Sequence, residues 1–223
     1  AENQGFWSPS ETRFESAADQ HISQTAGVSF RGYFLTTDTL GKIILDSDVR
    51  FENNTWDMGK STVATNGHTL TTVDYTLNNG KIQSDDLLSL QNSLLNVMTL
   101  DGNYRMDGKV RIKPDVVFNG TATLLDTLMN DWPWNPVLVI NGKIVNQGKI
   151  INNPAGYTLN LRLLGDAVNN GVWAPAETRF WSTADQRISQ SAGKAFRGYF
   201  ATTDTLGKII LASDVRFENN TWD

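Results

Sequence analysis

The chain repeats itself at a fixed offset. Residues 7–57 and 173–223 align without a gap, and 41 of the 51 positions are identical. Self-similarity at a fixed offset is typical of modular arrays. It predicts a structural or surface protein, and it indicates that the sequence is a window cut from a longer chain.

We therefore expect one continuous domain over residues 1–223. Residues 1–57 form the first copy of the repeat opening, 58–171 the remainder of the period, and 172–223 the second copy. If the two copies share a fold, they should superpose by translation along one axis with a modest rotation.

Composition narrows the fold and the partners. The chain has 21 Asn, 18 Gly and 10% aromatic residues, which favours a turn-rich all-β protein. The net charge of −5 and the lack of any Lys/Arg run argue against nucleic acid or anionic lipid as the main partner. The absence of Cys excludes disulfides and cysteine-ligated zinc. No apolar run is long enough to span a membrane, and no signal peptide is visible.

Apolar and polar residues alternate with period two in several segments. In YTLNLRL (157–163), Tyr157 and three leucines share one face, and in KVRIK (109–113) Val110 and Ile112 lie opposite the basic residues. The same pattern recurs around Arg50. Such alternation predicts strands with one buried face.

Asn-Gly and Asp-Gly pairs punctuate these strands, and their spacing indicates the architecture. The pair at Asn79 is followed by one at Asp101, and the pair at Asn119 by one at Asn141. Both intervals are about 22 residues, and coils of about 22–24 residues are typical of a parallel β-helix. We therefore expect a right-handed parallel β-helix, also called a β-solenoid.

The expected dimensions follow from the spacing of neighbouring strands. At ~4.8 Å per strand, about nine to ten coils give a length of roughly 45 Å, and about seven rungs per period give roughly 33 Å. Stacked Asn side chains at the corners should hydrogen-bond from rung to rung. An antiparallel sandwich with Asn-Gly hairpins is the rival architecture.

One window competes with this all-β interpretation. Residues 85–100 place five leucines near helical spacing behind Asp85 and Asp86, which fits a helix of two to three turns. The same window also fits two short strands with a bend at Gln91–Asn92.

The segment NGKIVNQGKIINNPAGYTLNLRLLGDAVNNGVW (141–173) resembles the repeat sequence pattern of bacterial secreted right-handed parallel β-helix proteins. Those proteins are large adhesin-like or surface-fibre solenoids. The resemblance covers 141–223 and, through the internal repeat, 1–57, whereas 85–136 matches poorly. It implies an extracellular or cell-surface location and a non-catalytic solenoid. No active-site motif of the family is matched.

Polysaccharide-degrading enzymes also use parallel β-helices, so the carboxylates are candidates for acid–base chemistry. The second copy argues against chemistry at three positions, which it replaces: Asp46 becomes Ala212, His21 becomes Arg187 and Glu15 becomes Trp181. We expect solvated polar faces rather than an active site.

Other carboxylates and the histidines complete the list of candidates. The carboxylates are Asp48, the pair Asp85–Asp86, and Asp185 with Glu177. His21 and His68 lack metal-ligand spacing, and no calcium loop motif is present. We expect no metal site and no cofactor.

The most distinctive local sequence is DWPWNP (131–136), which places Trp132 and Trp134 on either side of Pro133. Exposed aromatic rings can stack on sugars, so these two residues are the candidate ligand-binding site, with carbohydrate as the ligand. The alternative is that both rings cover the flank of the solenoid. A structural or adhesive module is the leading function, and a carbohydrate-binding module or a polysaccharide-degrading enzyme are the alternatives.

Two expectations concern the surface and the ends. Positions that differ between copies should face outward, because charged side chains are rarely buried unpaired; they are Ser8/Ala174, Glu15/Trp181, His21/Arg187, Val28/Lys194 and Asp46/Ala212. Neither terminus carries a capping helix pattern, so the terminal coils should expose strand edges that self-associate or continue into a longer chain. A continuation beyond Asp223 should resemble the sequence from Met58 onward.

Overall fold

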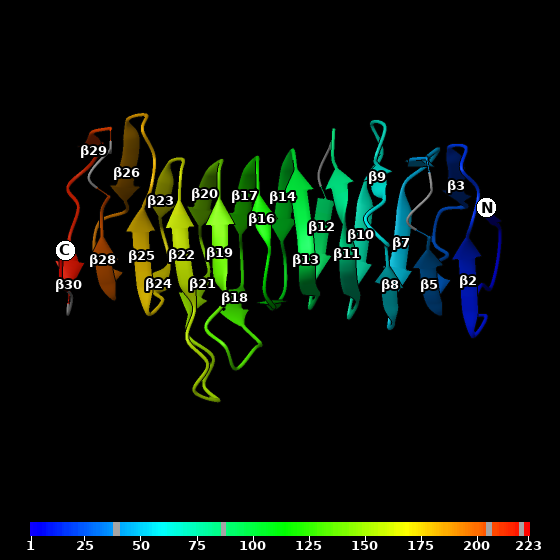
Figure 1. Ribbon diagram of the computed structural model, residues 1–223, viewed down its shortest axis with the longest axis horizontal. Helices are drawn as coiled ribbons and strands as arrows, with labels where there is room; N and C mark the ends of the chain where they lie inside the picture. The colour runs from blue at the N-terminus through cyan, green and yellow to red at the C-terminus, as the bar shows by residue number, and fades with distance from the viewer. Residues whose placement is uncertain (38–40, 86–87, 204–206, 219–220) are drawn as a thin grey trace.

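The computed structural model describes residues 1–37, 41–85, 88–203, 207–218 and 221–223. The chain is an all-β solenoid that winds around one long axis in about ten turns, from the N-terminal end on the right of Figure 1 to the C-terminal end on the left. The strand pairings of the described residues are parallel, for example Leu70 opposite both Val49 and Leu88. The predicted parallel β-helix is therefore confirmed, and the antiparallel sandwich is wrong.

Each turn contributes three strand segments, so the solenoid has three faces. Face I is a ten-stranded sheet: β4 (Phe30–Arg31), β7 (Val49–Glu52), β10 (Leu70–Val73), β12 (Leu88–Gln91), β14 (Asn103–Met106), β17 (Thr121–Leu124), β20 (Lys143–Asn146), β23 (Ala167–Asn169), β26 (Gln186–Gln190) and β29 (Ile209–Leu211).

Faces II and III follow face I around each turn. Face II comprises β2 (Glu11–Phe14), β5 (Tyr33–Thr36), β8 (Thr55–Asp57), β15 (Val110–Ile112), β18 (Thr127–Asn130), β21 (Lys149–Ile151), β24 (Val172–Ala174), β27 (Phe196–Arg197) and β30 (Phe217–Glu218). Face III comprises β1 (Glu2–Asn3), β3 (Gln20–Gln24), β6 (Ile43–Leu45), β9 (Thr62–Ala64), β16 (Val117–Phe118), β19 (Val137–Ile140), β22 (Asn160–Leu163), β25 (Glu177–Phe180) and β28 (Tyr199–Ala201). Two longer strands, β11 (Thr76–Gln83) and β13 (Leu94–Asp101), cross from face II to face III.

Coil length varies more than the narrow range expected from the corner pairs. Gln20 lies opposite Ile43, whereas Leu88 lies opposite Tyr104, so the second of these coils is much shorter than the first. The short coils lie in the middle of the chain, where β11 and β13 turn the II/III corner without a loop. The bend is made inside each strand by one residue with positive φ, Asn79 in β11 and Val97 in β13.

The window 85–100 forms strands and not a helix. Residues 86–87 lie outside the described part, and the rest of the window contributes β12 and most of β13. The alternating burial of Leu88 and Leu90 matches strand periodicity, and Asn92 takes a positive φ of 51° at the bend. The two-strand interpretation of this window is therefore correct.

Asn-Gly pairs build corners where successive coils approach closely. A Cβ on Gly120 would lie 1.6 Å from the carbonyl oxygen of Gly102, and one on Gly142 would lie 1.9 Å from that of Gly120. Beside this glycine column, the Asn141 amide donates to Asn119 Oδ1 at 2.6 Å. The predicted rung-to-rung Asn ladder is confirmed at this corner, and glycine is required there because backbone fills the side-chain space.

The core is a continuous apolar column inside the three faces. Alternation predicted most of its members correctly: Val110, Ile112, Leu159, Leu161 and Leu163 are all at most 1% exposed. Tyr157, expected on the same face, precedes β22 and is partly exposed. Aromatic rings dominate near the N-terminus, with Phe14, Phe30, Phe34, Phe51, Trp56 and Tyr75 in contact. The five pairs of positions expected to face outward lie outside the core, since all ten of these residues are partly or fully exposed.

The two copies of the repeat occupy different faces of the solenoid. On face II, β24 lies eight coils after β2. The strand that repeats the sequence of β2 is β25, which comes directly after β24 along the chain and lies on face III. Likewise β3 on face III corresponds to β26 on face I, and β7 on face I to β30 on face II. One period is thus eight and a third coils, about 40 Å at ~4.8 Å per coil. The expected seven rungs and modest rotation are wrong, because the short central coils add turns and the copies differ by about a third of a turn.

Candidate functional site

The DWPWNP segment forms a loop that projects from the II/III corner between β18 and β19. It lies beside a second loop, between β21 and β22, and both hang from one edge of the solenoid at the bottom of Figure 1. Asn130 joins them: its buried amide donates to the Trp132 carbonyl at 2.7 Å and to the Thr158 carbonyl at 2.8 Å. Thr158 also donates to the Asn135 side chain. The loop is therefore anchored to its neighbour on the next rung.

The two tryptophans of this loop are in different environments. Trp134 is 76% exposed, whereas Trp132 is only partly exposed and lies beneath Lys113, whose Nζ is 5.2 Å from the ring centroid. The Trp132 backbone amide donates to Asn130 Oδ1 at 2.7 Å. Of the two rings, Trp134 alone presents a free face of the kind that sugar stacking needs. The pair proposed from sequence therefore separates into a covered residue and an exposed one.

A cationic and aromatic patch, not expected from sequence, follows this loop on face III. It consists of Arg162, Arg179 and Trp181: Arg162 Cζ is 4.3 Å and Arg179 Cζ 5.7 Å from the Trp181 ring centroid. Arg179 also pairs with Glu177 at 2.8 Å. A hollow of about 240 Å³ beside the two arginines is lined by Val137, Asn160, Leu161, Arg162, Glu177 and Arg179. The sequence signal was only the exchange of Glu15 for Trp181, since Arg162 reaches the site through strand register.

A larger hollow, about 790 Å³, lies at the same II/III corner but nearer the N-terminus. Leu35 and Val97 give it apolar walls, and Asp57, Asn79 and Lys81 contribute polar groups. Asn79 donates to Asp57 at 3.1 Å, and Lys81 pairs with Asp101. These polar groups therefore pair across neighbouring rungs.

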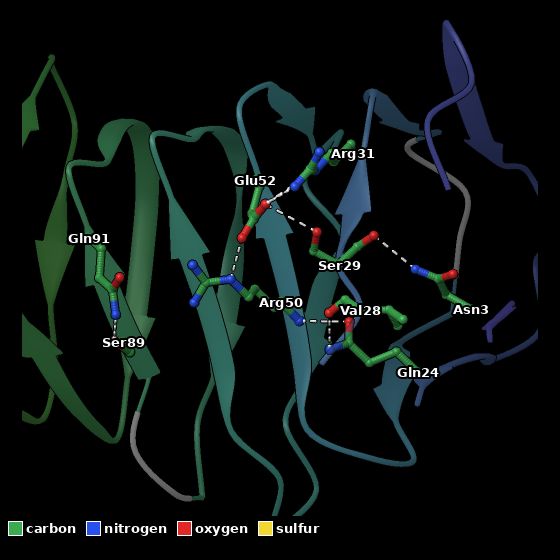
Figure 2. Close-up of polar contacts among 9 residues, drawn as sticks. All are labelled: Asn3, Gln24, Val28, Ser29, Arg31, Arg50, Glu52, Ser89 and Gln91. Atoms are coloured by element: carbon green, nitrogen blue, oxygen red, sulfur yellow. Dashed lines mark hydrogen bonds and ion pairs between the residues drawn. The ribbon is translucent and has the colours of Figure 1, made fainter. Parts of the chain in front are cut away.

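Face I carries an ion-pair cluster centred on Glu52 (Figure 2). Glu52 accepts hydrogen bonds from Arg50, from Arg31 at 2.8 Å and from Ser29 at 3.1 Å. The Arg50 hydrogen bond, reinforced by those of Arg31 and Ser29, lowers the pKa of Glu52 despite partial burial of the carboxylate, which acts in the opposite direction. Figure 2 also shows Asn3 reaching the Ser29 carbonyl, so the cluster links three successive rungs.

Three of the other carboxylates considered for catalysis make structural contacts. Asp46 contacts His21 at 2.9 Å, Asp48 accepts the Thr69 amide at 2.8 Å, and Asp185 accepts the Lys208 amide at 2.8 Å. Asp86 lies outside the described residues. Across the described ranges, no group of three His, Asp or Glu residues is arranged to hold a metal ion.

Comparison with protein families, with curated proteins and with solved structures finds no match. In the part of the chain that the structure describes, no helix is long and apolar enough to cross a membrane. The solenoid fold and its surface features thus carry the functional argument.

Proposed function

We propose that the chain is a structural and adhesive repeat module of an extracellular bacterial surface protein or fibre, in which coils stack head-to-tail in a tandem array. The observation that supports this proposal is that the unit 7–57 recurs along a single stack of parallel coils. Solenoids gain length by adding units whose contacts are limited to their neighbours. An extended, repeatable rod suits a spacer or adhesive stalk.

We also propose that the module is non-catalytic. Support comes from three candidate carboxylates: Glu177 pairs with Arg179, and Asp48 and Asp185 accept backbone amides. A glycosidase needs two carboxylates that are free to meet one sugar ring. Release of reducing ends or unsaturated products from acidic polysaccharides by the purified chain would refute this part of the proposal.

A second candidate function is carbohydrate binding at the II/III corner or on the outer side of face III. The observations that favour it are the exposed ring of Trp134 on the II/III corner loop and, on face III, the separate patch formed by Arg162, Arg179 and Trp181. Aromatic faces stack on sugars, and guanidinium groups bind carboxylate or sulfate bidentately. An anionic glycan therefore fits the chemistry of these side chains better than a neutral one.

Adhesion of chain-coated beads to a glycan array and to cultured animal cells tests both candidates. Retention above beads coated with an unrelated acidic protein is expected, and retention at that control level on every surface would refute adhesion. If the ligand is a glycan, Trp134→Ala should lower retention at least about tenfold, whereas Trp132→Ala serves as the matched variant with a covered ring. Adhesion that is unchanged in Trp134→Ala and Trp181→Ala would remove the carbohydrate candidate.

A further inference from the structure

The C-terminal end of the solenoid exposes a surface that the first copy keeps buried. Residues 209–223 repeat residues 43–57 with 14 of 15 positions identical. In the second copy Leu211 is 55% and Trp222 43% exposed, and Ile209, Val215 and Phe217 are partly exposed. Their equivalents in the first copy are at most 2% exposed: Ile43, Leu45, Val49, Phe51 and Trp56.

The first copy also shows what covers this surface. The coil 58–83 covers it in parallel register: Val63 lies opposite Ile43, Leu70 opposite Val49, and Leu77 opposite Trp56. Its last residues, 81–83, begin the next rung and lie opposite 62–64. Tyr75 adds a ring contact with Phe51 at 5.6 Å between centroids. Because the two underlying coils are nearly identical in sequence, the coil 58–83 is complementary in shape and hydrogen bonding to both.

We infer that the terminal coil, in its described residues 209–218 and 221–223, is a docking surface for one occupant, a coil with the sequence of residues 58–83, bound one face further around the solenoid than in the first copy. This inference rests on the proposed array. The face is fixed by register: β29 lies on face I, whereas its equivalent β6 lies on face III. The occupant therefore places its copy of Thr62–Ala64 on face I.

This rotation determines how a continued array presents its surface. Each added period turns by about a third and advances about 40 Å, so three periods return a feature to the same face after about 25 coils. The corner loop with Trp134 would then appear on the three edges in succession. An array built this way presents its binding features in all directions around its axis, which suits contact with a surface at any orientation of the rod.

The test appends a covering segment to the full chain. Residues 58–83 are joined directly after Asp223, and the control joins residues 84–109, another apolar segment of this chain. Leu211→Cys supplies the only thiol in each protein, because the chain has no Cys. Thiol labelling should slow at least about 100-fold with the 58–83 extension, since a buried group reacts only through opening, and should stay fast with the control.

A disulfide in a separate protein tests the face and register. Ile210→Cys paired with Cys at the appended copy of Ala64 should oxidise readily, because the equivalent residues Ile44 and Ala64 are direct partners in the first copy. Circular dichroism checks that both extended proteins retain β structure. Equal labelling rates for the two extensions would overturn the docking inference. If the 58–83 extension protects the Leu211→Cys thiol but the disulfide does not form, the extension docks on another face or register, and the inferred rotation is wrong. Bead adhesion is measured separately, so loss of adhesion with full protection would refute the proposed function and leave the docking intact.

Discussion

Trp56 and Trp222 form a matched pair that measures what a covering coil contributes to stability. Trp56 lies 5.9, 5.9 and 4.9 Å from the ring centroids of Phe14, Phe34 and Phe51. Trp222 has the equivalent three neighbours at 5.9, 5.2 and 4.9 Å: Phe180, Phe200 and Phe217. The two indoles differ mainly in the next coil, which buries Trp56 fully, whereas Trp222 is 43% exposed. We expect Trp56→Ala to be clearly more destabilising than Trp222→Ala.

The expected difference follows from the exposed area. A tryptophan side chain buries about 200 Å², and apolar burial contributes about 25 cal/mol per Å². The 43% exposure of Trp222 therefore corresponds to about 2 kcal/mol of burial that only Trp56 gains. Trp56→Ala should cost about 4–5 kcal/mol, because it also leaves a closed cavity and an unpaired Thr36 hydroxyl, which now accepts the indole N–H at 2.8 Å. Trp222→Ala should cost about 2 kcal/mol, since the space opens to solvent.

Urea unfolding followed by far-UV circular dichroism gives the two free-energy changes. Hydrogen exchange of residues 207–223 reports whether the terminal coil opens before the rest, as local contacts in a solenoid allow. Costs that agree within about 0.5 kcal/mol would mean that the covering coil contributes nothing at this position. That outcome would refute the reasoning from exposure, and with it the complementarity of the coil 58–83.

Three further perturbations test the corners and the ion-pair cluster. Val97 is β-branched at φ 52°, whereas its counterpart one coil earlier is Asn79, so Val97→Asn should stabilise the chain by about 1 kcal/mol in urea unfolding. Gly120→Ala should prevent close stacking of the two coils, because the added Cβ meets a carbonyl oxygen. Calorimetry should show a thermal midpoint lowered by more than about 10 °C, which corresponds to roughly 3 kcal/mol of unfolding free energy. The lowered pKa of Glu52 means that its ionised carboxylate stabilises the folded chain above about pH 4.5, and that this contribution is lost as the pH falls through the folded pKa. Arg50→Gln should therefore raise the pKa of Glu52 in an NMR titration. It should also make the free energy of unfolding less dependent on pH in acid. No change in the titration of Glu52 would show that Arg50 does not hold its carboxylate.

Local sequence signals predicted the fold because each acts within one coil. Asn119 and Asn141 lie on adjacent rungs, as the spacing of their Asn-Gly pairs indicated. Alternation identified the buried faces of residues 109–113 and 159–163 because a strand has period two wherever it lies. The leucine-rich window was ambiguous, since short apolar runs fit either periodicity, and stacking of β12 between β10 and β14 decides it in favour of strands.

Features that depend on the lengths or on the register of several coils could not be predicted from local sequence. The repeat was visible, but the number of turns in one period depends on every corner length, and short central coils such as that from Leu88 to Tyr104 raise it above seven. The patch around Trp181 was missed for a related reason. Arg162 is remote from Trp181 in sequence and comes alongside Arg179 only through the register of β22 on β25. Sequence analysis predicts one ligand-binding pair of Trp132 and Trp134, because nothing in the local sequence shows that Lys113, from the previous rung, lies over the Trp132 ring.

The offset between the copies also shows what determines local structure in this solenoid. Arg31 and Glu52 pair at 2.8 Å across two strands of face I, and their equivalents Arg197 and Glu218 pair at 2.8 Å on face II. The same sequence therefore makes the same contacts on different faces, so its neighbours along the axis matter and the face does not. A period that ends a third of a turn out of phase keeps this contact, because strands of the same sequence pair on face I and on face II.

Surface chemistry is then free to differ between copies. On face II Arg13 contacts both Glu11 and Glu15, so the guanidinium is neutralised locally. On face III the exchange of Glu15 for Trp181 removes one of these carboxylates and leaves two guanidinium groups against an aromatic ring. One outward substitution, together with Arg162 of the preceding coil, thus adds an aromatic and cationic contact to a surface that keeps its Arg179–Glu177 ion pair. Repetition of the coil preserves the rod, and the side chains outside the core are where copies can acquire separate binding properties.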